Sequence, residues 1–505
     1  MAEAATEKQV TLRFLIDKKK NKVLYAQAGK DFVDILLSFL TFPLGTIARV
    51  VAKELELKNV NVGSLNNLYE SVANLDVEYF WTETSKEMLL QPRNYMEDYC
   101  QNLKLNIDDT EKMKFFICQN WECSRKESGS LLSIFKNRNC KCGKLMNREI
   151  SRKNETMINH EGFVPDICSF IIFDNLKMVP DNIQNFVSLP MNFGYEDFNS
   201  IKINTVVNVT RKEMVDLLKY SLLSETPLTD FFLKKKQFHE IAKPRSSLLF
   251  NIDDTEENVR EEMMKLKVLI RKSKMKVLFA IAEEDFVDIL FSFLTFPLGG
   301  VENMMKGNTS LGSIDNLYKS LVDLDGNKYL KSPSLKDKLV KARLAQQFKL
   351  QNQLLPIDEV PISYYSCYND FSSPSNVTGI LTPAQRYRKV VDDYARFLSK
   401  TYAPLSYLDP HSSTFESCGT GKGFIKSPSL YMVTDDLIVT PASSISIVSY
   451  LTMSNISPSD IEERVISIGR KEYLSLLKAS LISSSSLTDG LGQFINPIKE
   501  EKICN

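Results

Sequence analysis

A long phrase in the first half of the chain recurs in the second half. Residues 30–45 read KDFVDILLSFLTFPLG and residues 284–299, 254 positions later, read EDFVDILFSFLTFPLG, so that fourteen of sixteen residues agree. Residues 12–28 and 266–282 keep the same offset and are also similar. Solenoid repeats are about 20 to 50 residues long, so a repeat of this length indicates two copies of a whole folding unit.

Further matching blocks extend the repeat over most of the chain. GSLNNLYES at 63–71 corresponds to GSIDNLYKS at 312–320. RKEMVDLLKYSLLSETPLTD at 211–230 corresponds to RKEYLSLLKASLISSSSLTD at 470–489. The blocks occur in the same order in both copies, which favours a tandem duplication over scattered short repeats.

These blocks predict the domain boundaries. We expect a first repeat unit over residues 1–235, a second over 262–495 and a tail over 496–505. Residues 236–261 are rich in charged side chains and contain Pro244, which is typical of a linker.

Each unit combines strand and helix patterns. Apolar and polar residues alternate between Val10 and Ile16, and the turn DKKKN leads into a second apolar run, which predicts a β-hairpin. In the repeated phrase the apolar residues, Phe32 among them, lie at helical spacing on two neighbouring faces, which predicts a buried helix. Thr210 and Glu213 have the spacing of a capping box and predict the start of a closing helix. The predicted fold class is α+β, with two homologous lobes that each pack β-hairpins on a buried helix.

The acidic residues of these elements have ordinary structural explanations. Asp31 and Asp34 lie in the first turn of the predicted helix, where carboxylates interact favourably with the helix dipole. Such a pair could also hold a metal or act as acid and base. Asp174 and Asn175 fit the turn of a second predicted hairpin.

Four cysteines are concentrated in one short segment of the first unit. Cys118, Cys123, Cys140 and Cys142 form a C-x4-C pair and a C-x-C pair, separated by sixteen residues. Four thiolates in two close pairs suit tetrahedral zinc, and the loop length matches that of zinc ribbons. We therefore expect a zinc-ribbon-like insertion over about residues 115–145, with reduced cysteines that bind no metal as the alternative. Four cysteine ligands would close the coordination shell, which favours a structural over a catalytic zinc.

The second unit does not repeat this pattern. Cys367 in YYSC aligns with Cys118 in FFIC, but only Cys418 and His411 are nearby as further ligands. One zinc ion per chain is therefore expected, with a structural role. The histidines at 160, 239 and 411 show no metal-binding spacing, and each is expected at the surface.

Charge and targeting signals limit the function classes. The chain has 63 basic and 63 acidic side chains, so no overall field attracts nucleic acid or anionic membrane. The N-terminus does not resemble a secretory signal, and the longest apolar stretches are far shorter than the roughly 20 residues that span a bilayer. Nine cysteines, an odd number, suit a reducing compartment. We expect an intracellular protein, cytoplasmic or nuclear, with no signal peptide or transmembrane segment.

Basic residues gather at the predicted hairpin turns and in one further run. They are Lys18, Lys19, Lys20, Lys22, Arg271, Lys272, Lys274, Lys276 and Lys234 to Lys236. They could contact phosphates, but no aromatic residues are interleaved as single-stranded nucleic acid binding would need. Solvated hairpin tips are the simpler interpretation.

Several long phrases together resemble a plant-specific family known only as a domain of unknown function, six-seven-four in the usual numbering. The phrases are LRFLIDKKKNKVLYAQAGKDFVDILLSFLTFPLG, GSLNNLYES, KLMNREI and VTDDLIVTP. The resemblance covers almost all of the chain as two tandem copies. It implies a plant source and an intracellular setting, and it carries over no activity, cofactor or catalytic residue. The cysteine-rich segment before KLMNREI looks like a feature of the family, which supports zinc.

The expected function is that of a non-enzymatic binding or scaffold protein whose partners are other proteins. One alternative is an enzyme with a site between the two lobes, for which the sequence identifies no catalytic residue. A second alternative is a nucleic-acid or anionic-lipid binder that acts through the lysine-rich hairpin tips.

Overall fold

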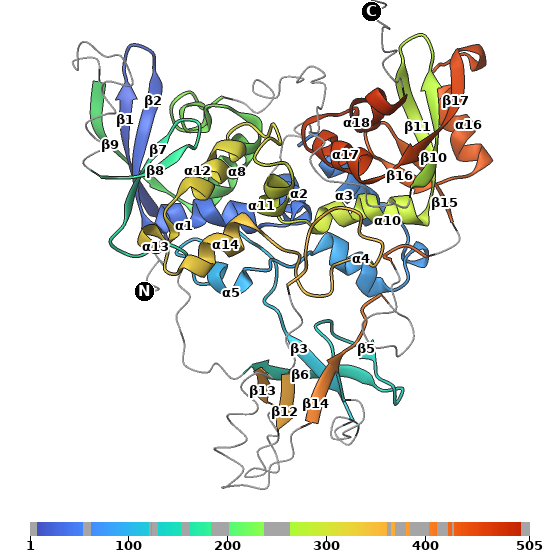
Figure 1. The fold of residues 1–505 in the computed structure, drawn as a ribbon, viewed down its shortest axis with the longest axis horizontal. Helices are drawn as coiled ribbons and strands as arrows, with labels where there is room; N and C mark the ends of the chain where they lie inside the picture. The colour runs from blue at the N-terminus through green and yellow to red at the C-terminus, as the bar shows by residue number, and fades with distance from the viewer. Residues whose placement is uncertain are drawn as a thin grey trace, which may run out of the picture.

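The computed structural model combines helices with three β-sheets, which confirms a mixed helix and sheet fold (Figure 1). It describes residues 8–53, 62–120, 123, 130–152, 162–182, 201–236, 263–360, 365–368, 380–383, 403–411, 423–426 and 429–495. We call the residues up to 236 the first half and those from 263 onward the second half.

The elements of the first half, in chain order, are β1 (Val10–Asp17), β2 (Lys22–Gly29), α1 (Lys30–Ser38), η1 (Phe39–Thr41), α2 (Leu44–Lys53), α3 (Leu65–Asn74), η2 (Val77–Tyr79), α4 (Glu83–Leu90), α5 (Glu97–Cys100), β3 (Phe115–Cys118), β4 (Ser130–Leu132), β5 (Arg138–Asn139), β6 (Leu145–Arg152), β7 (Ser169–Phe173), β8 (Met178–Pro180), β9 (Ile201–Val209), α8 (Arg211–Leu223) and η4 (Thr229–Leu233). Those of the second half are β10 (Met264–Arg271), β11 (Lys276–Glu283), α10 (Glu284–Ser292), η5 (Phe293–Thr295), α11 (Leu298–Met304), α12 (Ile314–Asp323), α13 (Gly326–Tyr329), α14 (Pro333–Val340), β12 (Tyr365–Tyr368), β13 (Ile380–Pro383), β14 (Ala403–Tyr407), β15 (Leu430–Thr434), β16 (Val439–Pro441), α16 (Ser444–Met453), η6 (Pro458–Asp460), β17 (Ile461–Ile468), α17 (Arg470–Ile482) and α18 (Ser486–Ile495).

Two five-stranded antiparallel sheets have the same strand order. The first is β8-β7-β2-β1-β9 and the second is β16-β15-β11-β10-β17. The predicted hairpins are present in both sheets, since β1 pairs with β2 and β7 with β8, and β10 pairs with β11 and β15 with β16. The predicted core helix is also confirmed, because Phe32 in α1 and Phe286 in α10 are buried. The predicted capping box at Thr210 and Glu213 starts α8.

The third sheet is built from both halves. Its order is β3-β6-β13-β12-β14-β4, in which β13 runs parallel to β6 and β14 runs parallel to β4. Phe116 and Ser133 exchange two backbone hydrogen bonds of 2.7 and 2.9 Å, which join β3 to the end of β4. The sheet therefore closes on itself, at the bottom of Figure 1.

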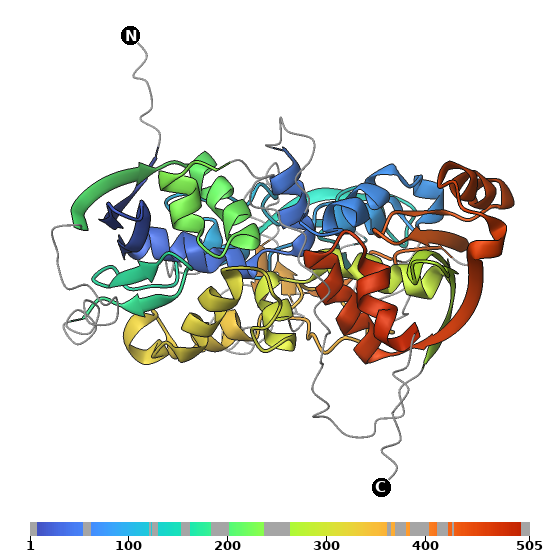
Figure 2. The same cartoon turned by 90° about the horizontal axis from the view of Figure 1, so that it is seen from above.

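Helices that follow the core helix in each half pack on the sheet of the other half. Val439 N–H, in β16, donates to Ser71 Oγ in α3 at 2.9 Å. In the matching contact, Met178 N–H in β8 donates to Ser320 Oγ in α12 at 2.9 Å. Figure 2 shows the yellow helices of the second half, α12 among them, beside the strands of the first half. Each half thus completes its core with helices from the other.

This exchange of helices between the halves begins where the two copies of the repeated phrase cross. Leu44 N–H donates to Phe296 O at 2.9 Å, and Leu298 N–H donates to Phe42 O at 2.9 Å. A Cβ on Gly45 would lie 2.9 Å from the carbonyl oxygen of Leu294, so the chains could not approach this closely with a larger residue. The end of the repeated phrase, FPLG, is therefore the contact between the halves.

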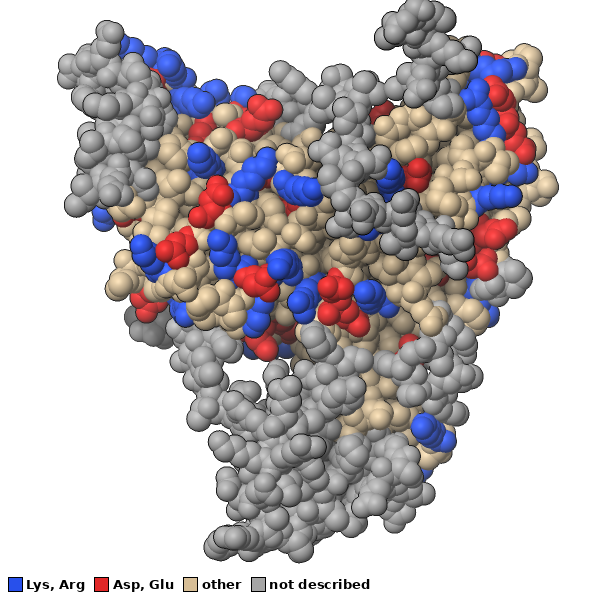
Figure 3. Space-filling model, in the orientation of Figure 1, with Lys and Arg blue, Asp and Glu red and all other residues tan. Residues whose placement is uncertain are grey.

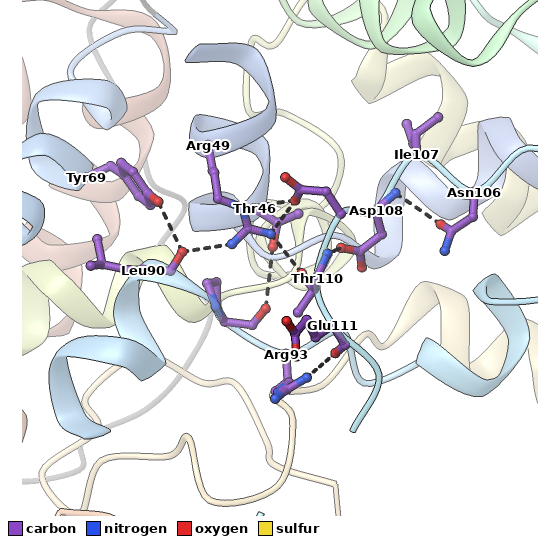
Figure 4. A network of polar contacts seen from close by, with 12 residues as sticks. Thr46, Arg49, Tyr69, Leu90, Arg93, Asn106, Ile107, Asp108, Thr110 and Glu111 are labelled. Atoms are coloured by element: carbon purple, nitrogen blue, oxygen red, sulfur yellow. Dashed lines mark hydrogen bonds and ion pairs between the residues drawn. The ribbon is translucent and has the colours of Figure 1, made fainter. Parts of the chain in front are cut away.

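Arg49 in α2 fixes the path of the chain towards the third sheet. Its guanidinium donates to Leu90 O at 2.8 Å and to Thr110 Oγ1 at 2.8 Å, and it pairs with Asp109 at 2.6 Å. Figure 4 shows this side chain between the end of α4 and the segment that leads to β3. Because Arg49 is buried, these charge-assisted bonds hold the start of the cysteine segment to the core.

Asp34 in α1 and its counterpart Asp288 in α10 anchor a loop each. Asp34 Oδ1 accepts hydrogen bonds from Phe163 N–H at 2.7 Å and Val164 N–H at 2.9 Å. Asp288 Oδ1 accepts the same pair of bonds, that from Phe424 N–H measuring 2.9 Å. The explanation of Asp34 by the helix dipole alone is therefore wrong, because this side chain is buried and holds a distant loop.

The two anchors differ in charge environment. Lys30 lies 3.0 Å from Asp34 Oδ2, whereas Glu284 occupies the place of Lys30 in the second half. Burial raises the pKa of both carboxyl groups, and that of Asp288 reaches about 8. At neutral pH Asp288 is therefore a protonated acid, while Asp34 is held by an ion pair.

We predict that replacing the two carboxyl groups by amides changes stability to different extents. In wild type, Asp288 has a higher pKa folded than unfolded, so its contribution to stability is full at acidic pH. It is lost, by about 1.4 kcal/mol per pH unit, as the pH rises from about 4 towards 8. Asp288→Asn removes this loss and should gain stability relative to wild type between pH 5 and pH 8. Asp34→Asn also removes a carboxyl group whose pKa is raised, but it gives up the Lys30 ion pair at the same time, so its gain over this range should be smaller than that of Asp288→Asn. Urea unfolding across this pH range measures both; equal behaviour of the two variants would contradict the assignment.

We also predict that the exchange depends on a glycine at 63. Gly63 has a φ of +53°, and a Cβ there would lie 2.4 Å from Ser480 O in the other half. Gly63→Ala should therefore lower the free energy of unfolding by more than about 1 kcal/mol. Gly492→Ala in α18 is the matched control, because no atom lies within 4 Å of its Cβ position and alanine favours a helix. Thermal denaturation should show a lower Tm for the first variant and an unchanged or higher Tm for the second.

Candidate metal centre and an exposed apolar helix

The four cysteines of the first half converge on one point. Their sulfur atoms all lie within 4.8 Å of one another and could hold a metal ion. Cys118 Sγ and Cys142 Sγ are 3.4 Å apart, and Cys123 Sγ and Cys140 Sγ are 3.5 Å apart. Four sulfurs at about 2.3 Å from a tetrahedral zinc would be about 3.8 Å apart, so the donor set fits this ion.

Strand pairing brings the two cysteine pairs together. Cys118 ends β3 and pairs with Met146 in β6, while Cys140 and Cys142 lie in the turn between β5 and β6. Within that turn Gly143 N–H donates to Cys140 O at 2.8 Å, and Gly143 adopts a φ of +78°. The glycine provides the left-handed backbone that a turn this tight requires.

Backbone donors and burial tune the thiols in different directions. The Lys144 N–H lowers the pKa of the exposed Cys142 to about 7. Burial raises the pKa of Cys118 and that of Cys123, the latter to about 11. Asn120 N–H donates to Cys118 Sγ at 3.3 Å and offsets part of the effect of burial on the pKa of Cys118. Metal binding at such a set would release protons.

The cysteine cluster is attached to both halves of the chain. Cys118 and Cys140 belong to a small apolar cluster with Leu131 and Met146 from the first half and Leu408 from the second. Leu408 N–H donates to Leu132 O at 2.8 Å, next to the pairing of β14 with β4. A metal held here would therefore stabilise the joint between the halves.

The candidates in the second half do not form a matching site among the described residues. Cys367 lies in β12, and Cys418 lies outside the described residues, as do His160 and His239. The expectation that His411 is a surface residue is wrong. It is 6% exposed, its ring lies edge-on to that of Phe424, and burial lowers its pKa.

A helix of the second half is apolar on both sides. One side of α16, which includes Ile447 and Tyr450, packs on the outer surface of the second five-stranded sheet around Phe279. The other side exposes Ile445 (80%), Val448 (62%) and Met453 (87%). Residues 437–459 contain no charged side chain. This charge-free run is a feature of the sequence that indicates an apolar surface on α16.

Comparisons with known proteins identify the family of the chain but assign no activity to it. A model of the family described as "Protein of unknown function (DUF674)" matches residues 6–471. No curated protein and no solved structure matches the chain. Among the described residues, none of the helices is long and apolar enough to cross a membrane.

Proposed function

The chain belongs to the DUF674 family, and we propose that it is a non-enzymatic binding or scaffold protein stabilised by one structural zinc ion. The exposed apolar side of α16 supports the binding role. The convergent cysteines support the zinc. We further propose that it arose as two tandem copies and works inside the cell, in the cytoplasm or nucleus, where its cysteines stay reduced.

The chemistry of the donor set supports a structural role for the metal. Four cysteine sulfurs would fill the tetrahedral shell and leave no open position for a substrate. The segment also lies where strands of both halves meet, so an ion there would stabilise a joint that apolar contacts from Leu131, Met146 and Leu408 hold in part.

We predict one equivalent of zinc per chain in the purified protein. Cys140→Ser should abolish it and expose residues 115–145 to limited proteolysis, because one ligand and the closed loop are lost. The hairpin of β1 and β2 should stay protected, since its core packing is independent of the cysteines. Atomic absorption and peptide mapping measure these results.

Cys168→Ser is the matched control for this experiment. Cys168 is a partly buried free thiol outside the cluster, so its loss should leave the zinc content at one equivalent. Purified wild type without zinc, or a Cys140→Ser protein that keeps it, would overturn the metal assignment.

The proposed binding role rests on the exposed side of α16. A helix with apolar residues on both sides and no charged side chain is normally buried on both sides. In α16 the side with Ile447 packs on the sheet, whereas Ile445, Val448 and Met453 lie in solvent. Leu430, 54% exposed, extends this surface, because Ala442 N–H just before α16 donates to its carbonyl. An apolar surface of another protein would fit it.

We predict that protein partners are lost when this surface is made polar. The triple variant Ile445→Ser, Val448→Ser and Met453→Ser should keep the wild-type Tm, because these side chains are exposed, and should lose most partners captured from the source tissue. Affinity capture followed by mass spectrometry measures the loss.

The control replaces three exposed apolar residues that lie elsewhere in the described chain, Val77, Ile167 and Val206, with serine. It should retain the captured partners. The same partners on wild type and on the α16 variant would show that binding does not use this helix.

An enzyme with a site between the halves is the alternative, and the surroundings of His411 favour it. Both ring nitrogens of His411 are buried, and the backbone of Gln347 and that of Gly423 act on its pKa. The charges of Asp409 and of Arg138, which belongs to β5 in the first half, both act on its pKa. We rank this alternative second, because the ring is buried against Phe424 and a substrate would reach it only after the chain moved.

A further inference from the structure

Eight lysines gather at the end of the first five-stranded sheet that carries the β1–β2 turn. They are Lys18, Lys19, Lys20, Lys22, Lys202, Lys234, Lys235 and Lys236. Two contacts bring them together: Lys202 pairs with Ile16 across β1 and β9, and Val23 N–H donates to Thr229 Oγ1 at 2.8 Å. The second contact places η4, and the lysines that follow it, beside the hairpin. We call this set the basic end; blue side chains mark it at the upper left of Figure 3.

Three aspartates in the described part of the chain are buried beneath the basic end. Asp17 accepts from the backbone N–H groups of Lys19 and Lys20, Asp174 lies 3.8 Å from Lys22, and Asp230 lies 2.8 Å from Lys236. The three aspartates are between 1% and 5% exposed. They act as turn and helix anchors, while seven of the eight lysines of the basic end are exposed.

The corresponding end of the second sheet has a more balanced charge. Arg271 pairs with Asp460 at 2.9 Å, whereas the Lys276–Asp435 pair matches the Lys22–Asp174 pair of the first sheet. The residues of the second half that correspond to the lysine run at 234–236 are QFI at 493–495. The same fold therefore forms without the extra lysines, so their presence in the first half is not a requirement of folding.

We propose that the basic end binds the anionic lipid headgroups of a membrane surface. Residues 17–22 and 234–236 include no aromatic side chain that could stack on bases. The two hairpin turns project on the same side of the molecule, at its two upper corners in Figure 1, so one flat surface can contact both. A protein that reads a DNA sequence would instead place a helix or a pair of strands in a groove of the duplex.

The attraction is electrostatic and reversible. The chain has no net charge, so the basic end must act locally, within the Debye length of about 8 Å at physiological ionic strength. Lysines that approach an anionic leaflet each contribute a free energy that corresponds to roughly fivefold in partitioning. Substitution of three such lysines should therefore weaken partitioning about 100-fold.

The test is flotation of the full chain with vesicles of phosphatidylcholine alone or with 30 mol% phosphatidylserine, a composition of about one anionic lipid in three. Wild type should float with the anionic vesicles at low salt, be released as salt is raised, and ignore neutral vesicles. The variant Lys18→Gln, Lys19→Gln and Lys20→Gln should lose most of this binding. All three side chains are exposed, so the fold should be unaffected.

The matched control is Lys272→Gln with Lys274→Gln at the second hairpin turn, which should weaken binding far less. Three outcomes would overturn the proposal: equal binding to neutral and anionic vesicles or none to either, an equal loss in the two variants, or tighter binding to duplex or single-stranded RNA than to anionic vesicles at the same salt. The last would assign the basic end to nucleic acid.

Discussion

The structure depends on a backbone contact between the two copies of one short phrase. Leu44 and Leu298 each donate an N–H to the carbonyl of the residue before the proline in the other copy. The contact needs glycine after each leucine, since a Cβ on Gly45 or Gly299 would meet a carbonyl oxygen at 2.9 Å. Because the chain crosses here, α3 and α12 follow onto the opposite sheets. Neither half could bury its core helix in this way alone.

The differences between the halves are as informative as their likeness. Where the backbone has the same task, the residue type is kept: Asp34 and Asp288 each receive two N–H groups from a loop that begins at a glycine. Around these anchors the side chains change, as with Lys30 and Glu284. The cysteine cluster, the basic end and the exposed side of α16 are described in one half only. Because the fold forms without these features in the other half, they are the first candidates for a role in function.

Local patterns predicted local structure well. The hairpins, the buried helix and the capping box of α8 follow from residue spacing, and the cysteine spacing anticipated a cluster whose sulfurs meet. The exchange of helices could not be predicted, because contacts such as that of Ser71 with Val439 join residues far apart in sequence and leave no periodic signal. Asp34 and His411 were misjudged for the same reason, since their burial comes from distant segments. The apolar outer side of α16 could have been predicted from its charge-free run.

The shared sheet changes the meaning of the missing cysteines in the second half. If each half formed its own sheet around β3 or β12, a structural metal would be needed twice, and its loss from one copy would argue that it matters little. The strands instead form one closed sheet, in which β13 pairs with β6 and β14 pairs with β4. The cluster at the end of β3 contacts Leu408 of the other half. One ion placed there would contact strands of both copies, so the lack of a matching set of cysteines in the sequence of the second half fits a sheet that the two halves share.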